Sequence, residues 1–124
     1  MNRVFLVEDS PLVLARLKEL VAAAPGAELV GEAGTAEEAI AGIPLSRPDM
    51  VFVDLNLAEG SGFDVLRALH PRLPEVEFYM LSNFAAFPYR QLAERLGAKD
   101  YFDKTRDFER VRDLVAQRTV STTH

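Results

Sequence analysis

The sequence has 124 residues, enough for one compact domain with its own core and too few for two ordinary domains. Hydrophobic residues make up 48% of the chain and charged residues 27%, a balance that is typical of globular proteins and excludes a disordered one. The formal net charge of −5 and the sequence pI of about 5.0 argue against direct binding of nucleic acid, because such modules usually concentrate Lys and Arg on one face.

The cysteine count and the hydropathy pattern exclude further classes of protein. There is no cysteine, which excludes disulfides, thiolate metal sites and cysteine catalysis. No apolar run approaches the roughly 18 residues that cross a bilayer, and the N-terminus lacks the pattern of a signal peptide. We therefore expect a cytoplasmic protein without a membrane partner.

The N-terminal part of the chain alternates strands with helices. Residues 4–7 form a short apolar run that predicts a strand, and apolar residues at helical spacing predict a helix at 12–24. A second strand is predicted at 28–32. A capping box at 35–38 predicts the start of a second helix, which we expect to stop at Pro44.

The rest of the chain repeats this alternation. Further strands are predicted at 50–53, 76–81 and 99–102. Helices are predicted from a weaker capping box at 61–64, over residues 88–96, and along the apolar face that starts at Phe108.

The order of these elements predicts the fold class. Strands that alternate with helices imply parallel βαβ units, since a parallel connection needs a crossover. Strands that are apolar at every position are typical of a sheet covered on both faces. We predict an α/β fold of the flavodoxin-like, doubly wound type: a five-stranded parallel sheet in the order 2-1-3-4-5 with helices on both faces. Residues 1–124 are expected to form one domain, with its core at about 3–118 and a short tail at 119–124.

Polar side chains follow four of the predicted strands. Ligands of such sheets bind outside the carboxyl ends of the strands where the strand order reverses, here between the first and third strands. Glu8 and Asp9 leave the first strand and Asp54 leaves the third, so three carboxylates face one crevice. The fourth strand adds Ser82 and the fifth adds Lys104.

This combination indicates phosphoryl transfer. Carboxylates this close together raise one another's pKa or recruit a cation, and an oxygen-only site suits a hard ion such as Mg²⁺, or Mn²⁺ in its place. A carboxylate nucleophile, a metal ion, a lysine and a hydroxyl then complete the set. Each residue alone has an ordinary structural explanation, so the prediction depends on their convergence.

The sequence resembles the receiver domain of bacterial two-component response regulators of the chemotaxis-regulator type, over roughly residues 3–118. The motifs that carry the resemblance follow strands one, three, four and five: Val7-Glu8-Asp9-Ser10, Asp54-Leu55-Asn56-Leu57, Ser82, and Gly97-Ala98-Lys99-Asp100-Tyr101-Phe102-Asp103-Lys104.

The resemblance implies a role for each residue of the crevice. Asp54 would be the phosphoacceptor. Mg²⁺ would be held by the side chains of Asp9 and Asp54, by the backbone carbonyl of Asn56, and by Glu8 through water. Lys104 would pair with the phosphoryl oxygens.

The resemblance also implies a switch and a set of partners. Ser82 would move to hydrogen-bond a phosphoryl oxygen while the ring of Tyr101 turns inward. The donor would be a histidine kinase or a histidine phosphotransfer protein, and the output a downstream protein target. The domain would catalyse its own phosphorylation and a slow autodephosphorylation rather than act as an ordinary enzyme. A homodimer through the face of the fourth and fifth helices is a further hypothesis.

The sequence departs from the family pattern at three places. Thr105 stands where the family usually has Pro, Leu57-Ala58 replaces Met-Pro, and Asn83 replaces a small residue. The departures concern the shape of the Lys104 loop and the rates of phosphorylation and dephosphorylation, and none removes a chemical group that the reaction needs.

The remaining candidate aromatic residues have structural interpretations as well as functional ones, whereas the two histidines have no functional one. Phe84, Phe87 and Tyr89 belong to an apolar loop that either packs inward or forms a partner surface. Tyr101 has a second interpretation as a partly buried aromatic of an edge strand. His70 and His124 are expected to be exposed and to carry no chemistry.

Alternative functions were weighed on the same residues. A phosphatase of the haloacid dehalogenase class would need two aspartates two apart after the first strand, and an FMN-binding flavodoxin would need a first loop without Glu8 and Asp9. A receiver-like interaction module that acts without phosphorylation remains the main alternative, because of Asn83 and Thr105. The chain ends soon after the last predicted helix, so we expect either a stand-alone receiver or a piece of a longer regulator.

Overall fold

The computed structural model of the chain describes residues 2–83 and 87–121, which form five strands and five helices. The strands are β1 (Asn2–Val7), β2 (Ala27–Ala33), β3 (Met50–Asp54), β4 (Glu77–Ser82) and β5 (Ala98–Asp103). The helices are α1 (Pro11–Ala22), α2 (Ala36–Ser46), α3 (Gly62–Leu69), α4 (Phe87–Arg95) and α5 (Phe108–Ser121).

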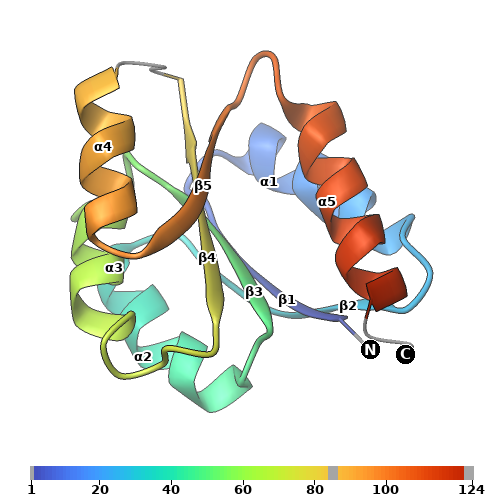
Figure 1. Cartoon of the computed structure of the whole chain (residues 1–124), viewed down its shortest axis with the longest axis horizontal. Coiled ribbons are helices and arrows are strands. Elements are labelled where there is room, and N and C mark those ends of the chain that lie inside the picture. Colours follow the sequence, from blue (N-terminus) through green and yellow to red (C-terminus); the bar gives the residue numbers. More distant parts are fainter. Residues whose placement is uncertain (1, 84–86, 122–124) are drawn as a thin grey trace.

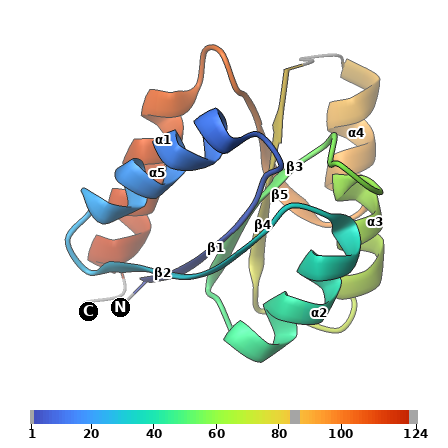
Figure 2. The ribbon, with the colours of Figure 1, turned by 180° about the vertical axis from the view of Figure 1, so that it is seen from behind.

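The strands form one parallel sheet in the order β2-β1-β3-β4-β5, which confirms the predicted fold class and strand order. Helices α1 and α5 cover one face of the sheet, and α2, α3 and α4 cover the other (Figures 1 and 2). The register aligns Val7 at the end of β1 with Val53 near the end of β3. The carboxyl ends of these two strands therefore meet at one edge of the sheet.

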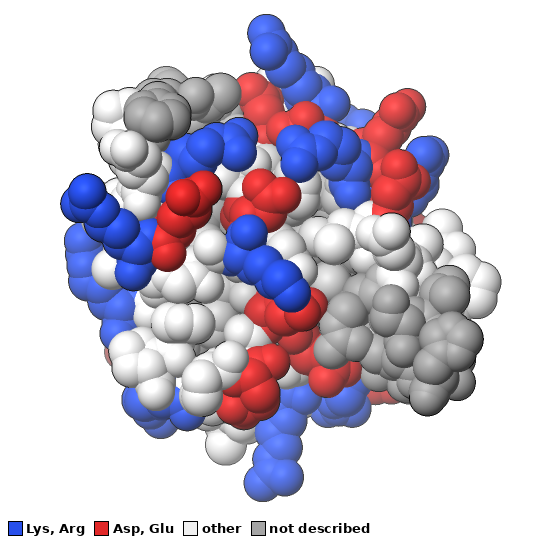
Figure 3. Space-filling view, viewed as in Figure 1, with Lys and Arg blue, Asp and Glu red and all other residues white. Residues whose placement is uncertain are grey.

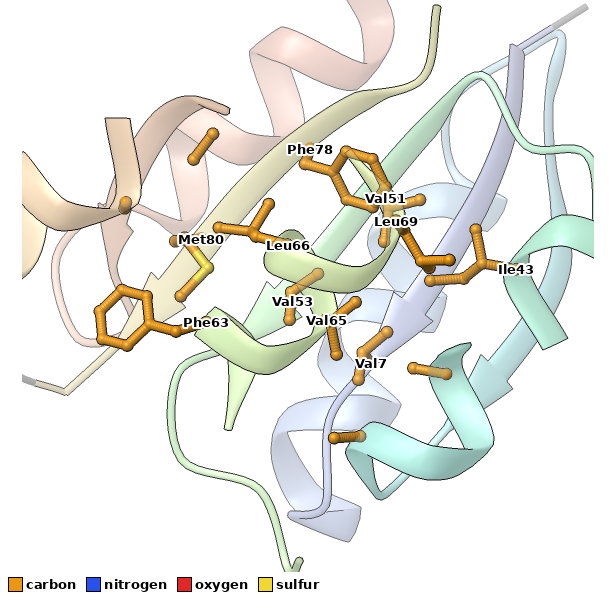
Figure 4. Close-up of a cluster of buried hydrophobic side chains, with 14 of the residues drawn as sticks. Val7, Ile43, Val51, Val53, Phe63, Val65, Leu66, Leu69, Phe78 and Met80 are labelled. Carbon is orange, nitrogen blue, oxygen red and sulfur yellow. The ribbon is translucent and has the colours of Figure 1, made fainter. Parts of the chain in front are cut away.

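Two hydrophobic clusters lie on the two faces of the sheet. The cluster under α2, α3 and α4 includes the labelled side chains of Figure 4, among them Val7, Val53, Leu66 and Met80. The cluster under α1 and α5 takes the alternate strand residues and the inner residues of those helices: Val4, Leu6, Met50, Phe52, Leu17 and Val115. Successive side chains of a strand point to opposite faces, so residues 50–53 are buried at every position because both faces are covered.

The helix starts follow the local capping chemistry of the sequence. Ser10 accepts a hydrogen bond from the backbone N–H of Val13, and Thr35 accepts one from the backbone N–H of Glu38. Ser61 forms a reciprocal capping box with the third residue of α3. Each cap satisfies a backbone donor that has no partner within the helix.

The expectation that the second helix stops at Pro44 is wrong, because α2 continues to Ser46. Pro44 lacks an N–H donor, but residues that follow it still make hydrogen bonds to the preceding turn of the helix. The hydroxyl of Ser46 donates to the Gly42 carbonyl at 3.0 Å, and the N–H of Arg47 donates to the Ile43 carbonyl at 3.1 Å. The helix ends only at Arg47, whose φ of 49° is left-handed.

Helix α5 continues past residue 118 to Ser121. The division into a core and a short tail stays a prediction. Among residues 2–83 and 87–121, no helix combines the length and the apolar character that crossing a membrane requires.

Candidate functional site

The four strand ends place their polar residues around one crevice. Glu8 follows β1, and its N–H donates to the Ala33 carbonyl at 2.9 Å, which continues the pairing with β2. The last residue of β3 is Asp54, and the last residue of β4 is Ser82. The N–H of Lys104 donates to the Ser82 carbonyl at 2.9 Å, so the chain leaves β5 beside the end of β4.

Lys104 makes the closest polar contacts of the crevice. Its Nζ lies 2.6 Å from Oε1 of Glu8 and 2.9 Å from Oδ2 of Asp54. All three residues are buried, with exposed fractions of 2% for Glu8, 3% for Asp54 and 8% for Lys104. The second oxygens of the carboxylates accept backbone N–H groups, Oε2 of Glu8 from Ser10 at 3.0 Å and Oδ1 of Asp54 from Asn56 at 3.2 Å. The two carboxylates are thus held in place by a shared cation and by their own loops.

Burial and charge shift the titration of this cluster. The pKa of Asp54 is raised to about 7, chiefly by burial; the hydrogen bond and charge of Lys104 oppose the rise, and the charge of Glu8 adds to it. Burial by itself lowers the pKa of Lys104, but its hydrogen bonds to both carboxylates prevail and raise that pKa. Asp54 is therefore easier to protonate than an ordinary aspartate, and Lys104 stays charged.

The acidic residues of the crevice fit a hard divalent cation. Glu8, Asp9 and Asp54 each offer a carboxylate oxygen, and these oxygens lie within 4.8 Å of one another. Asp9 is exposed, and an open cavity of about 370 Å³ adjoins it and Glu8. An all-oxygen donor set with open access suits Mg²⁺, which keeps several waters and takes one or two carboxylates. Asn56 lies in the loop that follows β3, two residues after Asp54.

Tyr101 lies buried within the domain. Its exposed fraction is 1%, and its side chain shares a hydrogen bond with Ser82. Burial raises the pKa of Tyr101, and the hydrogen bond with Ser82 opposes the rise. The guanidinium of Arg90 lies over the ring, with Cζ 5.5 Å from its centroid, and pairs with Asp100 at 3.8 Å. Tyr101 does lie on an edge strand, β5, but the expectation that it is only partly buried is wrong, because α4 packs against β5 and Arg90 lies over the ring.

The face around β5 carries paired charges rather than a field of one sign. Basic and acidic side chains lie interspersed across this face (Figure 3). Arg110 pairs with Asp100 at 3.3 Å, and Lys99 pairs with Glu77 at 2.8 Å. These pairs leave no purely basic patch in the view of Figure 3.

Of the other predicted residues outside the crevice, the structure describes the side chains of Tyr89 and His70. Tyr89 is exposed, with its ring centroid 6.4 Å from that of Phe63, whereas Phe84 and the side chain of Phe87 lie outside the described residues. The expectation that His70 is exposed is wrong. Its ring is half-buried, because it packs over Gly97 and lies edge-on to Phe78 with the ring centroids 6.3 Å apart. His124 lies outside the described residues.

The structure adds contacts around the site that the sequence reasoning missed. Lys104 contacts Glu8 as well as Asp54, and Asp103 accepts two hydrogen bonds from Thr105. The local sequence contains a signal for the second feature, since aspartate commonly accepts hydrogen bonds from the residue two positions on in a turn.

Residues 4–116 match the response regulator receiver domain family. The chain belongs to this family. It is thus a receiver domain of the kind that works in two-component phosphorelay signalling. This agrees with the resemblance carried by the motifs after strands one, three, four and five.

Relatives of this receiver domain include proteins with different outputs. The DNA-binding transcriptional activator DevR/DosR of Mycobacterium tuberculosis is 36% identical over 104 residues, which are 84% of this chain and 48% of that protein. A protein-glutamate methylesterase/protein-glutamine glutaminase of Carboxydothermus hydrogenoformans is 36% identical over 111 residues, 88% of this chain and 32% of that protein. The chain therefore spans half or less of the length of these relatives, and the expected lack of nucleic-acid binding stays a prediction.

A solved structure shares the fold. A chain of the CheX-CheY-BeF3-Mg+2 complex from Borrelia burgdorferi superposes with a TM-score of 0.82 at 22% identity, covering 99% of this chain and 90% of that one. The likeness shows that the receiver domain has the fold of that chain.

Proposed function

We propose that this receiver domain accepts a phosphoryl group on Asp54 and thereby switches a partner-binding face. The observation that carries the proposal is the contact of Lys104 Nζ with the Asp54 carboxylate at 2.9 Å, in a crevice that also holds Glu8 and Asp9. A fixed carboxylate nucleophile beside a cation suits phosphoryl transfer, because catalysis of this reaction consists mostly of positioning and charge stabilisation.

In the proposed reaction, a carboxylate oxygen of Asp54 forms a bond to phosphorus while the bond from phosphorus to its leaving group breaks. With a histidine kinase or a histidine phosphotransfer protein as donor, the leaving group is an imidazole nitrogen, which keeps the electron pair and takes a proton from water. Lys104 then pairs with a phosphoryl oxygen in place of the Asp54 oxygen. The hydrogen bond and charge of Lys104 lower the pKa of Asp54 against the effect of burial, and so favour the ionised carboxylate that attacks.

The acidic residues would hold Mg²⁺, or Mn²⁺ in its place. The side chains of Asp9 and Asp54 and the backbone carbonyl of Asn56 are the proposed ligands, with Glu8 acting through water. The ion supplies positive charge that offsets the charge of the phosphoryl oxygens. The all-oxygen donor set supports this assignment, as does the presence of both BeF3 and Mg+2 in the name of the Borrelia burgdorferi complex.

The proposed readout lies on the opposite side of the crevice from β1. Ser82 would turn toward a phosphoryl oxygen, and Tyr101, which already shares a hydrogen bond with Ser82, would report that movement to the face of α4, β5 and α5. A downstream protein would bind this face, with Tyr89 as one exposed contact and Phe84 and Phe87 as further candidates. A homodimer through the same face is part of the proposal, as is a cytoplasmic location.

A second candidate is an interaction module that works without phosphorylation. The specific observation in its favour is that Tyr101 is buried, at 1% exposed, with the guanidinium of Arg90 over its ring. Asn83, next to Ser82, is exposed, and in this candidate function its side chain would crowd an incoming phosphodonor. The face of α4, β5 and α5 would then bind its partner independently of phosphorylation.

The experiment that separates the two combines intact mass and NMR. The purified domain is incubated with Mg²⁺ and acetyl phosphate for mass spectrometry, and with Mg²⁺ and beryllofluoride for amide shifts, beside Asp54→Asn. Phosphoryl transfer predicts a mass gain of one phosphoryl group and shifts near Asp54, Ser82 and Tyr101, all absent from the variant. If the wild-type domain shows neither, the phosphorylation-independent module is the better description.

A further inference from the structure

The turn between β5 and α5 determines where Lys104 points. This turn stands at the top of Figure 1, between the end of β5 and the start of α5. Lys104 is the first residue after β5, yet its ammonium is buried between Glu8 and Asp54. A lysine side chain loses rotamer entropy when it is held in one place. Its backbone therefore has to be well fixed if the ammonium is to reach both carboxylates.

Side chains on both sides of Lys104 fix this turn. Oδ1 of Asp103 accepts the backbone N–H of Thr105 at 2.7 Å and the Thr105 hydroxyl at 2.6 Å. Oδ2 of Asp107 accepts the N–H of Asp103 at 2.7 Å, and the N–H of Asp107 donates to the Asp103 carbonyl at 2.9 Å. The hydrogen bonds from Thr105 lower the pKa of Asp103, so this carboxylate stays ionised. Charge-assisted hydrogen bonds of this kind are stronger than neutral ones.

We propose that Asp103 and Thr105 are positioning residues for Lys104: their paired hydrogen bonds hold the turn in the shape that directs the ammonium onto Glu8 and Asp54. The inference rests on the proposed function, in which Lys104 pairs with the phosphoryl group. Neither residue touches the reacting atoms, and both act through the lysine between them. Loss of either side chain leaves Lys104 in the sequence but widens the range of positions that its ammonium samples.

The test uses matched substitutions at both positions. Asp103→Ala removes both hydrogen bonds from residue 105, and Thr105→Val removes the one from its hydroxyl. Asp103→Asn and Thr105→Ser keep the accepting oxygen and the hydroxyl. Asp113→Ala, which removes an exposed carboxylate of α5, is the control for general charge effects. We expect Asp103→Ala to weaken beryllofluoride binding at saturating Mg²⁺ about tenfold and Thr105→Val about threefold. The two conservative variants and the control should stay within about twofold of the wild type.

A double-mutant cycle distinguishes positioning from a general structural role. The expected loss from Asp103→Ala disappears in a Lys104→Ala background, because the turn then has no ammonium to direct. Mg²⁺ affinity, measured by itself, stays within about twofold in Asp103→Ala, since Asp103 is not among the proposed ligands. An equal loss in both backgrounds, or a parallel loss of Mg²⁺ affinity, would make the turn a structural element only.

An NMR measurement keeps the inference separate from the proposed function. The ¹⁵Nζ signal of a lysine ammonium is visible when hydrogen bonds to carboxylates slow its proton exchange, and it needs no phosphoryl group. The Lys104 signal should be present in the wild type, Asp103→Asn and Thr105→Ser, and broadened beyond detection in Asp103→Ala. That pattern would support the positioning role even if the wild type fails to bind beryllofluoride. A Lys104 signal unchanged in Asp103→Ala would overturn the role whether or not beryllofluoride binds.

Discussion

Lys104 and Glu8 form a buried ion pair in which Nζ and Oε1 are 2.6 Å apart. The same ammonium lies 2.9 Å from Asp54, so one lysine contacts two of the three carboxylates that would face a metal ion. Lysine and metal therefore compete for the same negative charge. The lysine offsets part of the negative charge of the crevice, and this has measurable consequences.

Removal of the lysine should weaken the fold and strengthen metal binding. Lys104→Ala leaves Glu8 and Asp54 buried without their cation, so we expect a loss of roughly 3 kcal/mol in the free energy of unfolding without metal. Mg²⁺ should bind several-fold more tightly and restore part of that stability. Urea unfolding and calorimetric titration measure the two quantities. Lys18→Ala, which removes an exposed lysine paired with Glu32, is the control and should change neither by much. Unchanged Mg²⁺ affinity in Lys104→Ala would contradict the competition.

The raised pKa of Asp54 predicts a pH dependence of stability. This pKa is raised, chiefly by burial, from 3.8 to about 7 in the folded state. Between these two pH values the folded state therefore binds more protons than the unfolded state. Stability therefore falls as pH rises through this window. In metal-free buffer, the wild type should lose about 1–2 kcal/mol more than Asp54→Asn between pH 5 and pH 8. Denaturant unfolding at the two pH values checks this, and parallel losses in both proteins would show that another group is responsible.

The close approach of α3 to β3 predicts a strong effect at Gly62. A Cβ at this position would lie 2.6 Å from the carbonyl oxygen of Asp54 and 2.9 Å from the side chain of Met80, so the backbone has to shift. Gly62→Ala should lower the free energy of unfolding by about 1–3 kcal/mol and move the amide signals around Asp54.

Gly34 offers a matched control for this substitution, because a Cβ there meets nothing nearer than 3.9 Å. Gly34→Ala should leave stability within about 0.5 kcal/mol of the wild type, as most surface substitutions do. Equal stability of the two alanine variants would show that α3 can move away from β3 without cost.

The contact of Arg90 with Tyr101 predicts a change in the exposure of that tyrosine. Arg90→Ala removes the guanidinium over the ring and its pair with Asp100, so the ring should reach solvent more often. Nitration by tetranitromethane, mapped by peptide mass spectrometry, should then rise several-fold at Tyr101. The chain supplies both controls: Tyr79 is 3% exposed and should stay unreactive, and Tyr89 is 44% exposed and should react throughout. Protection of Tyr101 in the variant equal to that of Tyr79 would show that other contacts bury it.

Much of the fold and part of the site follow from local patterns. The strand runs such as 50–53 are apolar at every position because both faces of the sheet are covered, and this pattern appears in the sequence. The acidic residues at the ends of β1 and β3 could be assigned to one crevice because the strand order of a doubly wound sheet is itself predictable. The continuation of α2 past Pro44 could not be predicted from the sequence, because it depends on hydrogen bonds that the residues after the proline make to the preceding turn.

The sequence by itself determined the alternation of strands and helices, the strand order, and which chemical groups arrive at the crevice. Those features depend on hydrophobic periodicity and capping residues, which act over a few positions. Only the tertiary structure decided that Lys104 contacts Glu8 as well as Asp54 and that Arg90 lies over Tyr101. The positions of long side chains depend on competition among charges and on packing between segments far apart in the chain. Neither can be predicted from a pattern of a few neighbouring residues.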